Sequence, residues 1–95
     1  MSDSLGPDDV LRIAPHFRLQ WEEAQSSWVL LYPEGMVQLS ETAGEILTRC
    51  TGETSLLGVI EGMQALYPDD DIADDVRSFL QEAATHGWVR ARPIE

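Results

Sequence analysis

The feature that most constrains this chain is an apolar stretch at residues 28–39 that is interrupted once by Pro-Glu-Gly. Residues 28–32 read Trp-Val-Leu-Leu-Tyr, a continuous apolar run that is typical of a strand covered on both faces. Pro33 suits the second position of a turn because its φ is fixed, and Gly35 can supply the positive φ that closes a hairpin. Residues 36–39 then alternate in polarity. The stretch therefore predicts two strands joined by a tight turn.

A third strand is predicted just upstream, where residues 17–21 alternate as Phe-Arg-Leu-Gln-Trp. Residues 22–27 form a polar connection of hairpin length. The strands 17–21, 28–32 and 36–39 are therefore expected to form an antiparallel meander. No further strand obviously follows the last of them, so it is expected at a sheet edge, where backbone groups are left without partners.

Three helices are predicted after the meander, because three strands with one apolar face need helices to cover them. Their expected limits are 41–50 behind an N-cap at Ser40, from a cap at Thr54 or Ser55 to Pro68, and 72–86 before Gly87. Residues 88–92 suit a short C-terminal strand. The expected fold class is α+β and winged-helix-like, with the meander packed on a three-helix bundle.

The length of 95 residues suits one small domain, which we place at residues 15–92. Residues 1–14 are polar and punctuated by Pro and Gly, and we expect them to form a flexible N-terminal arm. An intramolecular disulfide framework is excluded because the chain has one cysteine. No signal peptide or membrane-spanning run is visible, so a cytoplasmic location is the simplest expectation.

The charge of the chain limits its partners. Seventeen acidic residues oppose six basic ones, all of them Arg, for a formal net charge of −11. Nucleic acid and anionic membrane surfaces are disfavoured, because binding to either needs a basic surface. Neutral or basic peptides and proteins are the expected partners.

No motif in the sequence supports catalysis, a cofactor or a metal, so we expect a protein that is not an enzyme. Cys50 could serve as a nucleophile, but it lies among apolar helical residues and is better interpreted as a buried thiol. The run 69–71, three Asp in succession, could attract a cation. An acidic helix N-terminus explains it better.

Several short runs resemble the PqqD family of pyrroloquinoline quinone biosynthesis. They are Leu-Tyr-Pro-Glu-Gly at 31–35, the runs 37–47 and 50–52, and the later runs 74–80 and 87–89, which are similar to the third helix of that family and its end. The resemblance spans roughly residues 15–92. Two positions depart from the family pattern: Ser40 stands where Asn is common, and Trp88 where an aliphatic residue is usual.

The resemblance implies a non-catalytic peptide chaperone. Such a protein binds the ribosomal precursor peptide PqqA and presents it to the radical S-adenosylmethionine enzyme PqqE, which cross-links a Glu and a Tyr of the peptide. In the wider family the peptide adds as a strand beside the third strand and packs against the third helix, a mode in which main-chain hydrogen bonds supply affinity.

Transferred to this sequence, the resemblance implies a peptide-binding site with three parts. The edge comprises Met36, Val37, Gln38 and Leu39; the apolar wall comprises Val76, Phe79, Leu80 and Ala83; and the polar contacts come from Asp75 and Arg77. Val37, Leu39, Val76 and Phe79 are equally well explained as ordinary core residues.

Two other functions stay open: leader recognition in another modified-peptide pathway, and an acidic protein-protein adaptor without a groove. A free edge and an N-terminal arm would also permit a homodimer by strand exchange.

Overall fold

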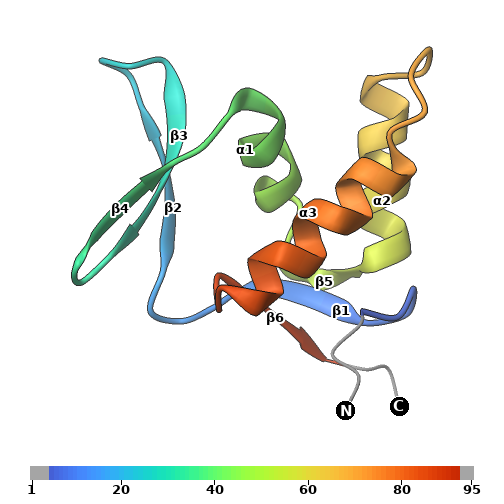
Figure 1. Ribbon diagram of the computed structural model, residues 1–95, viewed down its shortest axis with the longest axis horizontal. Coiled ribbons are helices and arrows are strands. Elements are labelled where there is room, and N and C mark those ends of the chain that lie inside the picture. The colour runs from blue at the N-terminus through green and yellow to red at the C-terminus, as the bar shows by residue number, and fades with distance from the viewer. Residues whose placement is uncertain (1–4, 93–95) are drawn as a thin grey trace.

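The computed structural model describes residues 5–92, which form six strands and three helices (Figure 1). In chain order these are β1 (Val10–Ile13), β2 (Arg18–Glu22), β3 (Ser27–Tyr32), β4 (Gly35–Gln38), α1 (Glu41–Thr48), β5 (Thr51–Ser55), α2 (Leu56–Leu66), α3 (Ala73–Thr85) and β6 (Val89–Arg92). The strands divide into two sheets, ordered β2-β3-β4 and β5-β1-β6. The expected α+β class is confirmed, including the C-terminal strand.

The predicted meander is the β2-β3-β4 sheet, and every strand end lies within one residue of its expected limit. Tyr32 pairs with Gly35, so Pro33 and Glu34 alone form the connecting loop. Gly35 has a φ of 159°, which is close to extended backbone. The turn therefore closes through its two loop residues rather than through a left-handed glycine.

The second sheet corrects the expectation of a flexible arm for part of residues 1–14. β1 is its central strand, paired antiparallel with β5 on one side and with β6 on the other. Leu11 in β1 is 0% exposed, because the helices cover that face of the sheet. Residues 1–4 of the expected arm lie outside the described residues. β5 is a strand that the sequence does not predict. Its residues read Thr-Gly-Glu-Thr-Ser and show no apolar alternation, so they are expected instead as the end of one helix and the cap of the next.

The helix caps follow the predicted chemistry. Ser40 Oγ accepts a hydrogen bond of 3.1 Å from the Ala43 backbone N–H at the start of α1. Ser55, rather than Thr54, caps α2, and its Oγ accepts from the Gly58 N–H. α3 ends before Gly87, whose φ of 80° is the left-handed conformation that favours glycine after a helix.

One hydrophobic core joins both sheets and all three helices. Its largest fully buried side chains come from both sheets and all three helices: Leu11, Leu30, Leu47, Leu56, Met63 and Leu80. α1 lies against β3 at Gly44, where a Cβ would overlap the Trp28 ring. This close approach attaches the meander to the helices and leaves α1 between the meander and α3 (Figure 1).

Candidate functional site

β4 forms an open edge of the meander among the described residues. The Leu39 N–H donates a hydrogen bond of 3.0 Å to the Trp28 carbonyl, and the register places Leu39 opposite Trp28. In an antiparallel pair, alternate residues direct both backbone groups toward the partner strand. Val37 therefore faces β3 with its N–H and C=O, whereas Met36 and Gln38 direct theirs away from the sheet. These two residues can pair with an added strand.

The side chains along this edge divide between core and solvent. Leu39 is 6% exposed and Val37 is half-buried against the core, so both contribute to packing. Met36 is 50% exposed on the opposite face of the strand. The Gln38 amide donates a hydrogen bond of 2.8 Å to Gln25 Oε1. The edge offers backbone groups at Met36 and Gln38 and leaves the side chains of Val37 and Leu39 inside.

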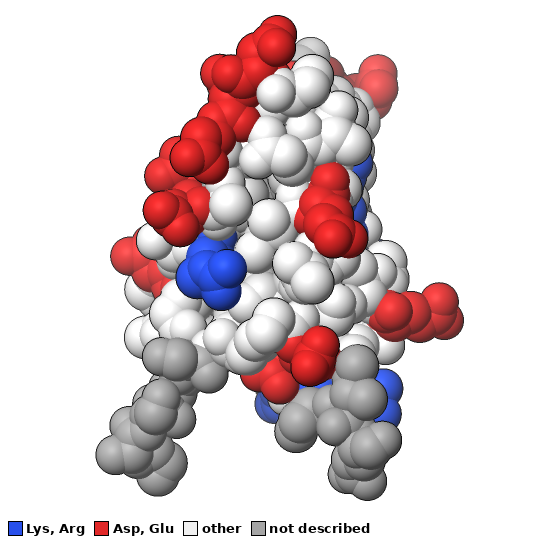
Figure 2. Space-filling view, turned by 90° about the vertical axis from the view of Figure 1, so that its right-hand side faces the viewer, with Lys and Arg blue, Asp and Glu red and all other residues white. Residues whose placement is uncertain are grey.

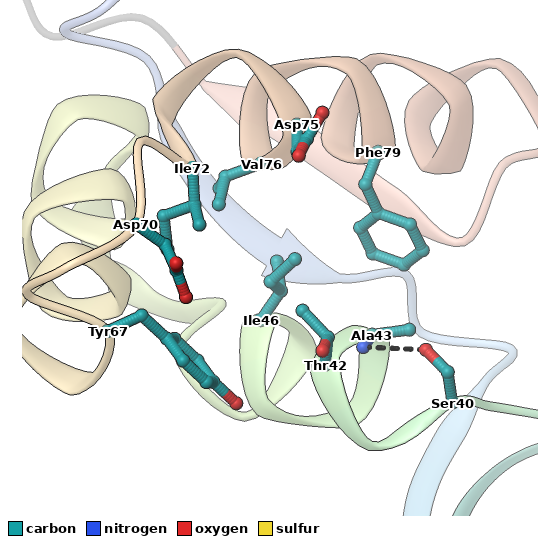
Figure 3. Close-up of a pocket in the computed structure, with 10 residues that line it drawn as sticks. All are labelled: Ser40, Thr42, Ala43, Ile46, Tyr67, Asp70, Ile72, Asp75, Val76 and Phe79. Atoms are coloured by element: carbon teal, nitrogen blue, oxygen red, sulfur yellow. Dashed lines mark hydrogen bonds between the residues drawn. The ribbon is translucent and has the colours of Figure 1, made fainter.

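A pocket of about 300 Å³ opens between α1 and α3 (Figure 3). It is lined by Ser40, Thr42, Ala43, Ile46, Tyr67, Asp70, Ile72, Asp75, Val76 and Phe79. Ile72, Val76 and Phe79 point from α3 and the residue before it toward α1, and Ile46 points up from α1 to meet them (Figure 3). Ser40 follows the end of β4 by two residues, so the pocket adjoins the strand edge. We refer to this pocket and the β4 edge together as the candidate groove.

The groove has an apolar floor and an acidic margin. The pocket lining includes Asp70 and Asp75 but no basic side chain. Residues 69–71 and the first turn of α3 carry further exposed Asp side chains. Figure 2 shows acidic side chains gathered at the top of the molecule and along one margin. Such a groove suits an extended segment with an apolar side chain for the pocket and a neutral or basic flank.

The structure brings only part of the expected α3 set to the groove. Val76, Phe79 and Asp75 line the pocket, but Val76 is only 1% exposed and belongs to the core. Leu80 and Ala83 are both 0% exposed and lie in the core, so they offer no surface to a peptide. Arg77 lines a different hollow on the outer side of α3. Helix periodicity places Val76, Phe79, Leu80 and Ala83 on one stripe, with Asp75 and Arg77 at its two sides, but it does not show which part of the stripe a neighbouring helix covers.

Sequence reasoning missed the contribution of α1 and of the segment before α3. Thr42 and Ile46 lie four residues apart on α1 and so share a face that lines the pocket. Tyr67 stands beside them from the end of α2 (Figure 3). Thr42 lies at the border of the apolar face of α1, between Ile46 and Arg49, where a polar residue is ordinary, so the sequence carried no clear signal for its role.

The remaining chemistry-bearing residues lie away from the groove. Cys50 is 3% exposed, and burial raises the pKa of its thiol to about 12, so the reactive thiolate is suppressed at neutral pH. This confirms the interpretation of Cys50 as a buried thiol.

Within residues 5–92, no three His, Cys, Asp or Glu side chains are placed to hold a metal ion. None of the helices in that range is long and apolar enough to span a membrane.

The fold is shared with a solved recognition element for ribosomally made, modified peptides. It matches the solution NMR structure of the PqqD truncation of Methylobacterium extorquens PqqCD, described as a functional, stand-alone recognition element of this kind. The TM-score is 0.74 at 24% identity, over 92% of this chain and 95% of that one. The heterocyclase TruD contains a similar fold, with a TM-score of 0.66 at 21% identity over 88% of this chain and 12% of the enzyme.

Sequence comparison identifies the family within that class. The family model for coenzyme PQQ synthesis protein D (PqqD) matches residues 27–89, and this chain belongs to the PqqD family. A "PqqA binding protein" of Methylococcus capsulatus is 45% identical over 87 residues, covering 92% of this chain and 94% of that protein. A protein of the same name from Kluyvera intermedia is 42% identical over 80 residues, covering 83% and 87%.

Proposed function

We propose that this chain binds a precursor peptide of the PqqA type and serves pyrroloquinoline quinone biosynthesis as a non-catalytic peptide chaperone. The observation that carries the proposal is the open edge at Met36 and Gln38 beside an apolar pocket. The names of the similar proteins from Methylococcus capsulatus and Kluyvera intermedia supply the identity of the peptide.

In the proposed complex the peptide adds to β4 as a fourth strand of the meander. Its backbone exchanges hydrogen bonds with Met36 and Gln38, and one apolar side chain enters the pocket between Ile46 and Phe79. Asp70 and Asp75 favour a basic or neutral residue next to that side chain. We expect low- to sub-micromolar affinity, which corresponds to about 8 to 9 kcal/mol.

The first prediction concerns the backbone donor at Gln38. Gln38→Pro removes an N–H that points away from β3, and an edge strand tolerates proline at such a position. Loss of one ladder hydrogen bond should weaken binding of a synthetic PqqA-type peptide by about tenfold. Isothermal titration calorimetry measures the change. Unaltered affinity in the folded variant would exclude β4 as the binding edge.

Val37→Pro is the companion variant, because the Val37 N–H faces β3. It should disrupt the meander itself, which heteronuclear NMR spectra would report as widespread changes in β3 and β4.

Phe79→Ala tests the pocket separately, because it shortens the apolar wall without touching the strand edge. We expect weaker peptide binding with an unchanged NMR pattern in the meander.

We further propose that the bound peptide is presented to the radical S-adenosylmethionine enzyme PqqE. This step rests on membership of the PqqD family and on the groove, which binds the peptide along one edge and leaves the rest of the molecule available to an enzyme. Leader recognition for another modification enzyme is the second candidate, because a similar fold occurs in the heterocyclase TruD. Its test is whether the genes beside this one encode a PqqA-type peptide.

A further inference from the structure

The outer face of the β5-β1-β6 sheet gathers half of the basic residues of the chain. Arg12 in β1 lies directly opposite Arg90 in β6, and Arg92 lies opposite Val10 on the same face. Leu11 and Val89 point to the other face and are buried under the helices. The three arginines line a hollow of about 450 Å³ with Val10, Thr51, Gly52 and Ala91.

These arginines have no anionic partner within residues 5–92. The ion pair in that range joins Arg49 to Glu45, at 3.2 Å. Arg12 and Arg90 instead form a like-charged cross-strand pair, an arrangement that destabilises a sheet. Gly52 lies beside Arg12 and carries no side chain, which keeps the hollow open at that point. The face therefore maintains three exposed guanidinium groups in a protein whose formal net charge is −11.

We propose that this arginine face (Arg12, Arg90 and Arg92) is a docking site for an acidic, extended segment of a partner protein. Guanidinium groups bind carboxylates in bidentate geometry, which gives both energy and orientation. Arg90 and Arg92 are two residues apart on one strand, a repeat of roughly 7 Å. Alternate side chains of an extended segment have the same repeat, so successive carboxylates can meet successive arginines.

The charge of the whole molecule favours such a segment over nucleic acid. A long polyanion would experience the net negative charge over its whole length, whereas a short segment interacts only within a Debye length of about 8 Å at physiological salt. The hollow also includes Val10, which lies on the same face as the arginines and offers apolar contact to side chains between the carboxylates.

The arginine face lies apart from the candidate peptide groove. Its sheet lies below the helices in Figure 1, whereas β4 belongs to the other sheet on the opposite side of α1. A partner bound at the arginine face would leave the β4 edge and the pocket accessible. The docking proposal therefore does not depend on the proposed function, and either can fail alone.

The test uses NMR of the arginine side-chain Nε–Hε groups in the full chain. The probe is the peptide acetyl-Glu-Val-Glu-Val-Glu-amide, and its control replaces every Glu by Gln. We expect the acidic peptide to shift the signals of Arg12, Arg90 and Arg92, while Arg18 on β2 stays unchanged. Equal shifts with the Gln peptide, or none with the acidic one, would overturn the proposal.

A variant sharpens the test. Arg12→Gln with Arg90→Gln removes the like-charged pair and should lower the affinity for the acidic peptide at least about tenfold, whereas Arg18→Gln should leave it unchanged.

Inorganic phosphate is titrated in parallel. If phosphate binds at the same arginines as tightly as the peptide, the face is a small-anion site and the docking proposal fails. Self-association of the chain that the double variant abolishes would assign the face to a second copy instead.

Discussion

At the scale of single residues, Gly44 decides how the meander meets the helices. A Cβ at this position would overlap three atoms of Trp28, including Cγ and Cδ1 of its ring. Trp28 in turn packs edge-on against Trp21, with ring centroids 5.4 Å apart. The glycine therefore permits the contact that holds α1 against β3, and no local signal in the α1 sequence indicates this role.

Gly44→Ala is expected to destabilise the protein despite the better helix propensity of alanine. Overpacking typically costs about 1–3 kcal/mol, whereas the gain in propensity is about 1 kcal/mol. Urea unfolding would measure the difference. Gly62→Ala in α2 is the matched control, because its new Cβ would meet only the Arg49 side chain, which can move. Equal effects of the two substitutions would contradict the proposed role of Gly44.

At the scale of elements, β1 shows how a short strand can be essential. It has four residues and one fully buried side chain, Leu11, but it is hydrogen bonded on both sides. β5 and β6 meet only through it, since the sheet order is β5-β1-β6. Too few apolar residues occur in residues 1–14 for periodicity to indicate a strand. Only the pairing with distant segments makes its importance visible.

Deletion of residues 1–14 should therefore abolish cooperative folding, because it removes the centre of one sheet and leaves two strands unpaired. Deletion of residues 1–4 alone is the control and leaves β1 in place. Thermal unfolding by circular dichroism and the dispersion of NMR spectra report the result. A chain of residues 15–95 that retained a native spectrum would show that the domain begins after β1.

At the scale of the whole molecule, the groove and the arginine face occupy different sheets. A carrier that presents a bound peptide to an enzyme needs such a separation, since the enzyme must reach the peptide without displacing it. The acidic margin of the groove and the basic outer sheet face also differ in sign, which would favour different partners at the two places.

If the chain presents a PqqA-type peptide to PqqE, analytical ultracentrifugation should detect a ternary complex. Gln38→Pro should weaken incorporation of the peptide into the complex by about the same tenfold, while the enzyme still binds, because the substitution affects only the β4 edge. Loss of both partners together would indicate that the enzyme recognises the peptide alone or the β4 region. If PqqE does not bind the chain at all, the proposed presentation step is wrong and peptide binding is the function that remains.

The sequence by itself determined the local elements of this protein. The apolar alternation of the meander, the Pro-Glu turn, the cap at Ser40 and the glycine after α3 each depend on neighbouring residues, so periodicity and turn chemistry were sufficient. The buried state of Cys50 was predictable for the same reason. The motifs shared with the PqqD family were also visible without a structure.

Only the tertiary structure decided how these elements use their surfaces. Leu80 and Ala83 belong to the core rather than to the groove, β1 and β5 exist because distant strands pair with them, and Thr42 reaches the pocket because α1 lies beside α3. The arginine face arises in the same way, from residues far apart in the chain. Periodicity reports which face of a helix or strand is apolar, but packing determines what covers that face and what stays open.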